Sequence, residues 1–532
     1  MQVTERSPWR PWLLPVSVWF VVQCFVLGRL SQALATYEGG SGAQFHTHLQ
    51  RLLAWRHIER ALAFEADFWR LPVTLDGDFP PLLHVVTSLL VAAFGHSLEA
   101  ATASGMVWVV LLAAALGRIA HDLAPAASRH EAGAAAATGV LLVASYQAFS
   151  LRYYFDIPMT ALLWAGVAAL IALWDRSGWR TWLVPGALFA AAALTKWTAL
   201  AMGGLMGLGV LCLALRSSQE ERGRRVRAVV LSGLTAGLLA GGYAGLVGVV
   251  KGISSLQVMA DTFNEEAMEV TFLTVDRLRF YPTWIVRSVL SPALAIALLP
   301  LIGLWTLRSR AGLGLVLMTV MGQLGWLVTR VPILDERFVL TLVPAILLTA
   351  ALGFASLGKR ARLLTAPLVI LLGLTVCWDA HFGESDVFQI ADPAWRLDHW
   401  RKLGMENAYN VDGAWARGET DGLDCSNLRD RLWGAVLSCE AITVGVGERE
   451  APLLSEGYWW AFKSLDEVVR GVDDAEFRLL NTWDGPGAEL VFTAGATPEG
   501  GGMVRIGDLD TSDCPEVSAI VVWAPNPREV CW

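Results

Sequence analysis

Long apolar runs recur along the first 378 residues of this 532-residue chain, and most are long enough to cross a lipid bilayer. Backbone N–H and C=O groups inside a bilayer must be hydrogen-bonded within the protein, so such runs are expected to fold as transmembrane α-helices. The sequence therefore predicts an all-α polytopic membrane domain of about 11 spans in residues 1–378. We place the spans at 12–34, 100–120, 132–151, 157–174, 181–197, 199–215, 228–250, 284–306, 312–329, 337–357 and 363–378.

A second domain is predicted where the apolar pattern stops. Residues 379–532 carry 12 Lys+Arg and 28 Asp+Glu, a balance of −16, whereas residues 1–378 have a balance of +8. So acidic a tail is unsuited to nucleic acid, which we exclude as a partner. Short apolar segments at 441–446, 489–493 and 519–523 predict strands, so the tail is expected to be an α/β or α+β domain.

The placement of Lys and Arg predicts the topology. With eleven spans, all the basic linkers fall on one side of the membrane, which the positive-inside rule makes the cytoplasm. The N-terminus is then cytoplasmic, and the long loop 35–99 and the tail share the opposite side. The apolar stretch 80–95 breaks this pattern if it is a span, but it also suits a short helix lying in the interface. The basic linkers are Arg6 to Arg10, Arg118 to Arg129, Arg176 to Arg180, Arg216 to Arg227, Arg308 to Arg310 and Lys359 to Arg362.

Four cysteines lie in the tail, and an even number in an exported domain predicts disulfides. Four cysteines allow three pairings, of which proximity favours Cys425–Cys439 and Cys514–Cys531. A metal site is the weaker alternative, because no CxxC motif or paired histidine accompanies them.

Asp156 is the candidate functional residue that the sequence marks best. It lies in the short link between the runs 132–151 and 157–174, so it is expected at or just inside the membrane surface. A carboxylate at bilayer depth costs about 2.5–3.5 kcal/mol, and such residues usually mark function. The alternative is a helix N-cap, with Pro158 at the first helical position.

Four short motifs follow one another in the order and spacing of a known superfamily. Together they resemble the GT-C integral membrane glycosyltransferases, in particular the bacterial branch with the lipid A aminoarabinose transferase and the protein O-mannosyltransferase relatives. The resemblance covers about residues 10–378 and implies a GT-C-like fold in a bacterial inner membrane, with the tail periplasmic. The motifs are Asp78-Phe79-Pro80-Pro81-Leu82, Tyr153-Tyr154-Phe155-Asp156-Ile157-Pro158, Leu194-Thr195-Lys196-Trp197 and Asp335-Glu336-Arg337-Phe338.

The resemblance implies inverting transfer of a sugar from a polyprenyl-phosphate donor to a periplasmic lipid, glycan or protein. Such a displacement needs a base for the acceptor's proton, the role implied for Asp156. The family's first acid, usually an Asp directly after the first span, is missing. Either Glu38 takes that role, or Asp78 does, or the chemistry is altered or lost. Because Asn and Gln keep the shapes of Asp and Glu, amide substitution at Asp156 or Glu38 is expected to slow transfer without changing stability.

The departing phosphate needs cations, and Arg or Lys can supply them. Lys196, Arg330 and Arg337 are the candidates, and Tyr153 and Tyr154 are candidate substrate contacts. The alternative for Lys196 is an interface lysine that extends its ammonium toward water. For the two arginines the alternative is pairing with Asp335 and Glu336. The sequence identifies no particular cofactor, and a divalent ion shared by carboxylates is an option, because some relatives use one.

Two other functions fit the composition. A lipid or saccharide transporter or flippase would show internal repeats and charges near mid-span; we find no repeat, and the notable charges lie at one membrane face. A noncatalytic scaffold derived from a transferase would explain the missing first acid.

The predicted topology can be tested with reporter fusions. A fluorescent protein that folds only in the cytoplasm should be active after residue 220 and inactive after residue 450. Alkaline phosphatase, which needs the periplasm, should give the reverse pattern. Two sites on the same side of the membrane would contradict the eleven-span arrangement.

Overall fold

The computed structural model describes the helical domain in several stretches and the tail in four strands. Thirteen of its residues stand alone or in pairs: 16, 17, 19, 21, 146, 150, 278, 279, 281, 282, 285, 302 and 303. The longer described ranges are 80–94, 98–143, 155–251, 312–331, 336–382, 444–446, 490–493, 504–509 and 520–524.

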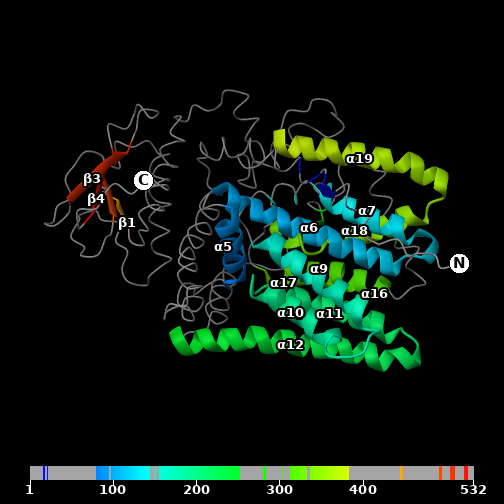
Figure 1. The fold of residues 1–532 in the computed structure, drawn as a ribbon. Helices are drawn as coiled ribbons and strands as arrows, with labels where there is room; N and C mark the ends of the chain where they lie inside the picture. Colours follow the sequence, from blue (N-terminus) through cyan, green and yellow to red (C-terminus); the bar gives the residue numbers. More distant parts are fainter. Residues whose placement is uncertain are drawn as a thin grey trace.

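Helices make up most of the described chain and pack side by side as a bundle (Figure 1). Four are long and apolar enough to cross a membrane: Ser104–Leu123, Asp156–Leu173, Gln219–Val249 and Gly312–Arg330, and Ala199–Leu215 and Val343–Ser356 are shorter apolar helices. The chain is therefore a membrane protein. The helices are α5 (Leu82–Phe94), α6 (Leu98–Leu123), α7 (Arg129–Leu141), α9 (Asp156–Leu173), α10 (Arg180–Ala193), α11 (Ala199–Leu215), α12 (Gln219–Lys251), α16 (Gly312–Leu317), α17 (Gln323–Arg330), α18 (Val343–Ser356) and α19 (Lys359–Phe382).

Among the described residues there are also three short helical turns. Two are 3₁₀ turns, η2 (Ala126–Ser128) and η5 (Glu336–Val339). The third, η4 (Met318–Gly322), is a π-helical turn that joins α16 to α17 within one span.

Helix α9 lies at the centre of the bundle. Its sequence is apolar all round apart from Asp156 and Thr160, which is typical of a helix enclosed by other helices. Of its span, 78% is buried. Helix α12, by contrast, is only 22% buried over its span and presents leucines to the outside, as expected of a helix facing lipid.

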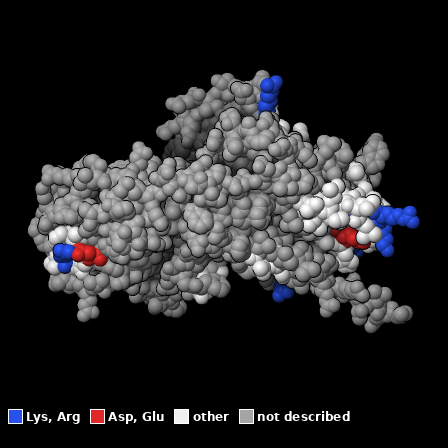
Figure 2. All heavy atoms as spheres, turned by 90° about the horizontal axis from the view of Figure 1, so that it is seen from above, with Lys and Arg blue, Asp and Glu red and all other residues white. Residues whose placement is uncertain are grey.

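The described basic linkers lie together at one end of the bundle, on the right in Figure 1. They form the turns between α6 and α7, α9 and α10, α11 and α12, and α18 and α19. Lys and Arg predominate over Asp and Glu at this end (Figure 2). The described turns thus share one side, as their charge predicts, while the number of spans is still a prediction.

Helix α5 lies across the other end of the bundle (Figure 1). Thr87 Oγ1 and Ser104 Oγ lie 3.3 Å apart and link α5 to α6. The direction of α5, across the bundle rather than along its long helices, agrees with the alternative of an interfacial helix, and its place in the membrane is still a prediction.

The described part of the tail is a four-stranded mixed sheet of order β1-β2-β4-β3. β1 pairs with β2 in parallel, and β4 lies antiparallel to both β2 and β3. Three strands lie where the apolar segments predict them, but β3 was not predicted, because its alternation is interrupted by Gly507 and a register irregularity. The strands are β1 (Val444–Val446), β2 (Leu490–Thr493), β3 (Val504–Leu509) and β4 (Ile520–Ala524).

Helices α10 and α12 approach closely at Gly186. A Cβ atom built there would lie 2.6 Å from Thr235 Cβ and 2.9 Å from the Ser232 carbonyl oxygen, closer than real contacts allow. Ser232 Oγ also donates to the Trp182 carbonyl at 3.2 Å. Small residues that let helix backbones approach are a common packing device in membranes.

Gly186→Ala is therefore expected to destabilise the helical domain by about 1–3 kcal/mol, the usual cost of overpacking. Gly237→Ala on α12 is the matched control, because a Cβ there meets nothing within 4 Å. Thermal unfolding of the purified protein in detergent micelles measures both. Equal stability of the two variants would contradict the close approach.

Candidate active site

Asp156 and Lys196 form a buried ion pair. Lys196 Nζ donates to Asp156 Oδ1 at 2.8 Å and to Oδ2 at 3.0 Å. The Asp156 side chain is fully buried, and that of Lys196 is 14% exposed. Forty residues separate the two in sequence, so the pair holds together two distant segments of the chain.

Asp156 is the first residue of α9, but it does not cap the helix. Phe155 occupies the N-cap position and makes no side-chain hydrogen bond to the helix. Pro158 is then the third helical residue, not the first. The N-cap interpretation is therefore wrong: the carboxylate turns to the ammonium of Lys196, a stronger partner than a backbone N–H because both groups are charged.

Lys196 lies in the tight turn between α10 and α11. Its backbone N–H donates to the Ala192 carbonyl at 3.0 Å, and its own carbonyl accepts from Ala199 N–H at 2.9 Å. Thr195 Oγ1 returns to the Ala191 carbonyl at 2.9 Å. These bonds fix the backbone so that the lysine side chain points into the bundle. The interpretation of Lys196 as an interface lysine extended toward water is therefore wrong.

The motifs at 78–82 and 335–338 also contact the segments that form the ion pair. The backbone N–H of Leu82, in the double-proline motif, donates to the Leu194 carbonyl at 2.9 Å. The Lys196 ammonium lies 5.2 Å from the centre of the Phe338 ring, within cation–π range. Segments from all four motifs, far apart in sequence, thus meet around one ion pair.

The segment that carries Phe338 is anchored by buried hydrogen bonds. Tyr146 Oη donates to the Leu340 carbonyl at 2.7 Å, and Trp164 Nε1 donates to the Thr341 carbonyl at 2.9 Å. Thr341 Oγ1 donates to Gln323 Oε1 at 2.9 Å. Because every anchor is a buried side chain, these bonds fix the segment that places the Phe338 ring beside Lys196.

Some predicted site residues are placed only in part. Arg330 ends α17, is exposed, and makes no ion pair within the described residues. Helix α17 runs antiparallel to α11, since Gly314 packs on Cys212 and Gly322 on Leu205. Arg330 therefore lies at the same end of the bundle as Lys196. The backbone of Arg337 belongs to η5, directly before Phe338.

The other predicted positions lie outside the described residues. They are Glu38, Asp78, Tyr153, Tyr154, Asp335 and the cysteines of the proposed pairs Cys425–Cys439 and Cys514–Cys531. Within the described ranges no group of three or more His, Cys, Asp or Glu side chains is arranged to hold a metal ion.

The sequence does not predict two contacts in this region, that of Phe338 with Lys196 and that of His84 with Phe155. Phe338 belongs to one of the four motifs, but its place beside Lys196 depends on folding. His84 is fully buried, and its ring meets that of Phe155 edge-on at 5.5 Å between centroids. A histidine inside the apolar stretch 80–95 is an unusual feature that could have drawn attention to it.

The sequence matches no protein family profile and no curated protein. Among solved structures, ArnT from Cupriavidus metallidurans bound to undecaprenyl phosphate is similar, with a TM-score of 0.52 at 15% identity over 96% of this chain and 98% of that chain. The same protein in the apo state gives 0.50. The Archaeoglobus fulgidus oligosaccharyltransferase with a tethered acceptor peptide gives 0.44 at 10% identity over 86% and 63%. ArnT is the lipid A aminoarabinose transferase, and the likeness shows that this chain shares its fold, as the resemblance in the sequence implies.

Removing one partner of a buried ion pair leaves a charge without compensation and costs about 3–5 kcal/mol. The pair therefore revises the expectation that shape-conserving substitution spares stability. We expect Asp156→Asn and Lys196→Met each to destabilise the protein by about 3 kcal/mol, and the double variant to lose less than the sum.

Unfolding of the purified protein in detergent micelles measures this cycle. Asp508→Asn is the matched control, because Asp508 pairs with Arg505 at the surface, where ion pairs contribute about 1 kcal/mol or less. Additive losses in the double variant would show that Asp156 and Lys196 do not interact.

Proposed function

We propose that this protein is a membrane glycosyltransferase that uses a polyprenyl-phosphate sugar donor. The observation that carries the proposal is the buried Asp156–Lys196 pair at the meeting point of the motif segments. The GT-C fold, shared with ArnT in its complex with undecaprenyl phosphate, supports the donor class. The sugar is transferred by inverting displacement to a periplasmic lipid, glycan or protein.

Asp156 acts as the general base. A carboxylate that takes the acceptor's proton during attack must be fixed in position and kept from bulk water. Its position in the first turn of α9, in the rigid centre of the bundle, meets both conditions. The acceptor hydroxyl loses its proton to a carboxylate oxygen as its own oxygen attacks the anomeric carbon, and the phosphate leaves on the opposite side.

Lys196 holds the donor phosphate. Its ammonium is bound to Asp156 in this structure, so an incoming phosphate competes with the carboxylate for the same cation. The donor phosphate is a diester with one negative charge, like the carboxylate, and it forms equally strong charge-assisted hydrogen bonds. Its negative charge increases as the bond to the sugar breaks, so the ammonium stabilises the leaving phosphate. When the ammonium shifts toward the phosphate, an Asp156 oxygen becomes available to the acceptor. Donor binding thereby prepares the base.

Residues outside the pair complete the site in this proposal. Arg330 and Arg337 supply further positive charge to the phosphate, and Tyr153 and Tyr154 line the sugar. Glu38, or in its place Asp78, supplies the second carboxylate. The site faces the periplasm of a bacterial inner membrane, with the basic turns in the cytoplasm.

A noncatalytic scaffold is the second candidate, and the same ion pair favours it. Because the two charges satisfy each other, the pair would stabilise the bundle without any substrate. In a scaffold, the pair would only stabilise the fold. In a transferase, the Asp156 carboxylate would also take the acceptor's proton. Stability and activity must therefore be measured on the same variants.

Asp156→Asn is expected to lower the transfer rate at least about a hundredfold, the low end for loss of a general acid–base group. The measurement is transfer of radiolabelled sugar from polyprenyl-phosphate donors to a membrane extract by reconstituted protein. Asp175→Asn is the matched control, since Asp175 is also ion-paired but lies at the opposite end of α9. It should keep full activity.

Two further variants separate the roles. Lys196→Met should weaken donor binding, measured with labelled undecaprenyl phosphate, whereas Asp156→Asn should not. The double variant Asp156→Asn/Lys196→Met removes both charges and should regain stability while staying inactive. If the wild-type protein transfers no sugar from any donor tested, and the pair contributes only stability, the scaffold is the better description.

A further inference from the structure

The end of the bundle opposite the ion pair carries a concentration of arginines. The turn between α9 and α10 and the segment from the end of α11 into α12 together hold seven arginines and three acids, a balance of +4. The acids are Asp175, Glu220 and Glu221. The arginines fall into two groups, those that bind acidic side chains of the protein and those that make no such pair within the described residues.

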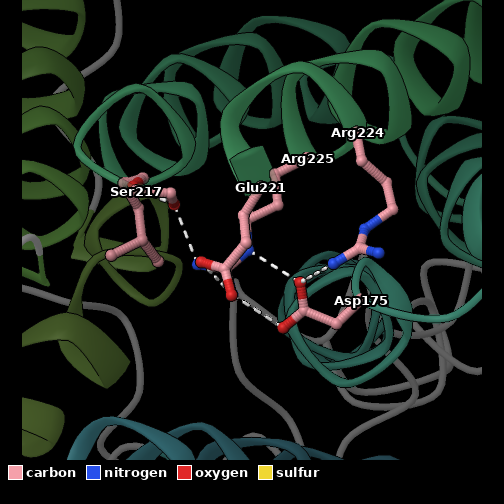
Figure 3. Close-up of polar contacts among 6 residues, drawn as sticks. Asp175, Ser217, Glu221, Arg224 and Arg225 are labelled. Carbon is pink, nitrogen blue, oxygen red and sulfur yellow. Dashed lines mark hydrogen bonds and ion pairs between the residues drawn. The ribbon is translucent and has the colours of Figure 1, made fainter. Parts of the chain in front are cut away.

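Arg225 and Arg224 bind other side chains of the protein (Figure 3). Arg225 binds Asp175 through two bonds, Nε to Oδ1 at 2.8 Å and Nη2 to Oδ2 at 2.7 Å, and Ser217 Oγ through Nη1 at 2.8 Å. Its Nη2 also lies 3.2 Å from Glu221 Oε2, and its guanidinium stacks 4.8 Å from the Trp174 ring. Arg224 Nη2 adds a longer contact of 3.3 Å to Asp175 Oδ1.

We term these contacts of Arg224 and Arg225 the arginine clamp. The clamp neutralises most of the acidic charge of the region. Partial burial raises the pKa of Asp175, but hydrogen bonds and charge from Arg225 and then Arg224 outweigh it, so the pKa of that carboxyl is lowered. Asp175 is therefore ionised and neutralised at neutral pH. Glu221 is likewise turned toward Arg225, which leaves Glu220 as the exposed acid of the region without an ion pair in the described structure.

The remaining five arginines form what we term the arginine surface. All are exposed, and none makes an ion pair within the part of the chain that the structure describes. Arg180 packs against the exposed ring of Trp179, with its guanidinium carbon 5.5 Å from the ring centre. The surface consists of Arg176, Arg180, Arg216, Arg222 and Arg227.

The arginine surface adjoins the lipid-facing surface directly. On α12, the exposed apolar side chains of Val230, Leu234 and Leu238 begin one turn after Arg227. Ser232 contacts the Trp182 carbonyl, so Arg222 lies about 15 Å beyond that contact along the helix axis. Exposed tryptophan and arginine at the end of an apolar helix surface are typical of the membrane interface.

We propose that the arginine surface binds the headgroups of anionic phospholipids. Uncompensated positive charge at the depth of the headgroups attracts anionic lipids, and guanidinium groups bind phosphate oxygens through paired hydrogen bonds. The leucines that adjoin the arginine surface face lipid, so a soluble protein could not contact them. A lipid molecule can contact both, with its headgroup at the arginines and its acyl chains at the leucines. The site is separate from the Asp156–Lys196 pair and does not depend on the proposed function.

The test is lipid retention by the full-length protein in neutral detergent, measured by native mass spectrometry. Dioleoyl phosphatidylglycerol should be retained in preference to dioleoyl phosphatidylcholine. Arg222→Gln/Arg227→Gln should weaken retention of the anionic lipid on the order of tenfold or more, since one charge contributes about fivefold. Glu220→Gln should strengthen it about fivefold by removing the exposed acid.

Matched controls locate the effect. Arg505→Gln, in the tail, removes one positive charge outside the arginine surface and should leave retention unchanged. Arg360→Gln, an exposed arginine at the turn between α18 and α19, tests whether total charge at this end is sufficient. Equal retention of the two lipids by the wild-type protein, an unchanged Glu220→Gln variant, or an equal loss per charge in Arg360→Gln would each overturn the proposal.

Discussion

A carboxylate and an ammonium buried together at the end of α9 hold the described core in one arrangement. The pair joins the first turn of α9 to the turn between α10 and α11, and a backbone bond joins that turn to α5. In a membrane, apolar packing does not choose between helix arrangements as strongly as in water, because lipid is as apolar as the helices. A buried charge pair has one acceptable partner for each charge, so it specifies which helix ends meet.

The bundle is chemically polarised along its axis. At one end, Arg225 and Arg224 bind Asp175, and five further arginines make no ion pair among the described residues. At the other end, Asp156 and Lys196 neutralise each other near α5. The two ends share α9, which begins with Asp156 and is followed directly by Trp174 and Asp175. The same rigid helix therefore positions the candidate catalytic carboxylate at one end and the arginine clamp at the other.

The sequence predicts the parts of this structure that depend on local pattern. Apolar run length locates α9, α11 and α12, and the charge of the linkers predicts which turns lie together. Asp156 and Lys196 were each singled out, because a charge beside a span is costly and rare. Their pairing was not predicted, since 40 residues separate them and each had a plausible local role, as a cap or an interface lysine. The contact of Phe338 with Lys196 was missed for the same reason: it is created by packing, which single-sequence patterns do not encode.

The π-helical turn η4 determines which side chains of its span face the bundle. Counted at 100° per residue from Leu315, which packs against Gly209, an unbroken α-helix would turn Gln323 about 80° and Leu327 about 120° away from that face. A π-turn absorbs one extra residue, which brings both to within about 20° of Leu315. Both side chains are indeed buried, and Gln323 reaches Thr341. Without the added residue, the Gln323 amide would face lipid. With it, the amide faces the bundle and binds Thr341, in the segment that carries Phe338.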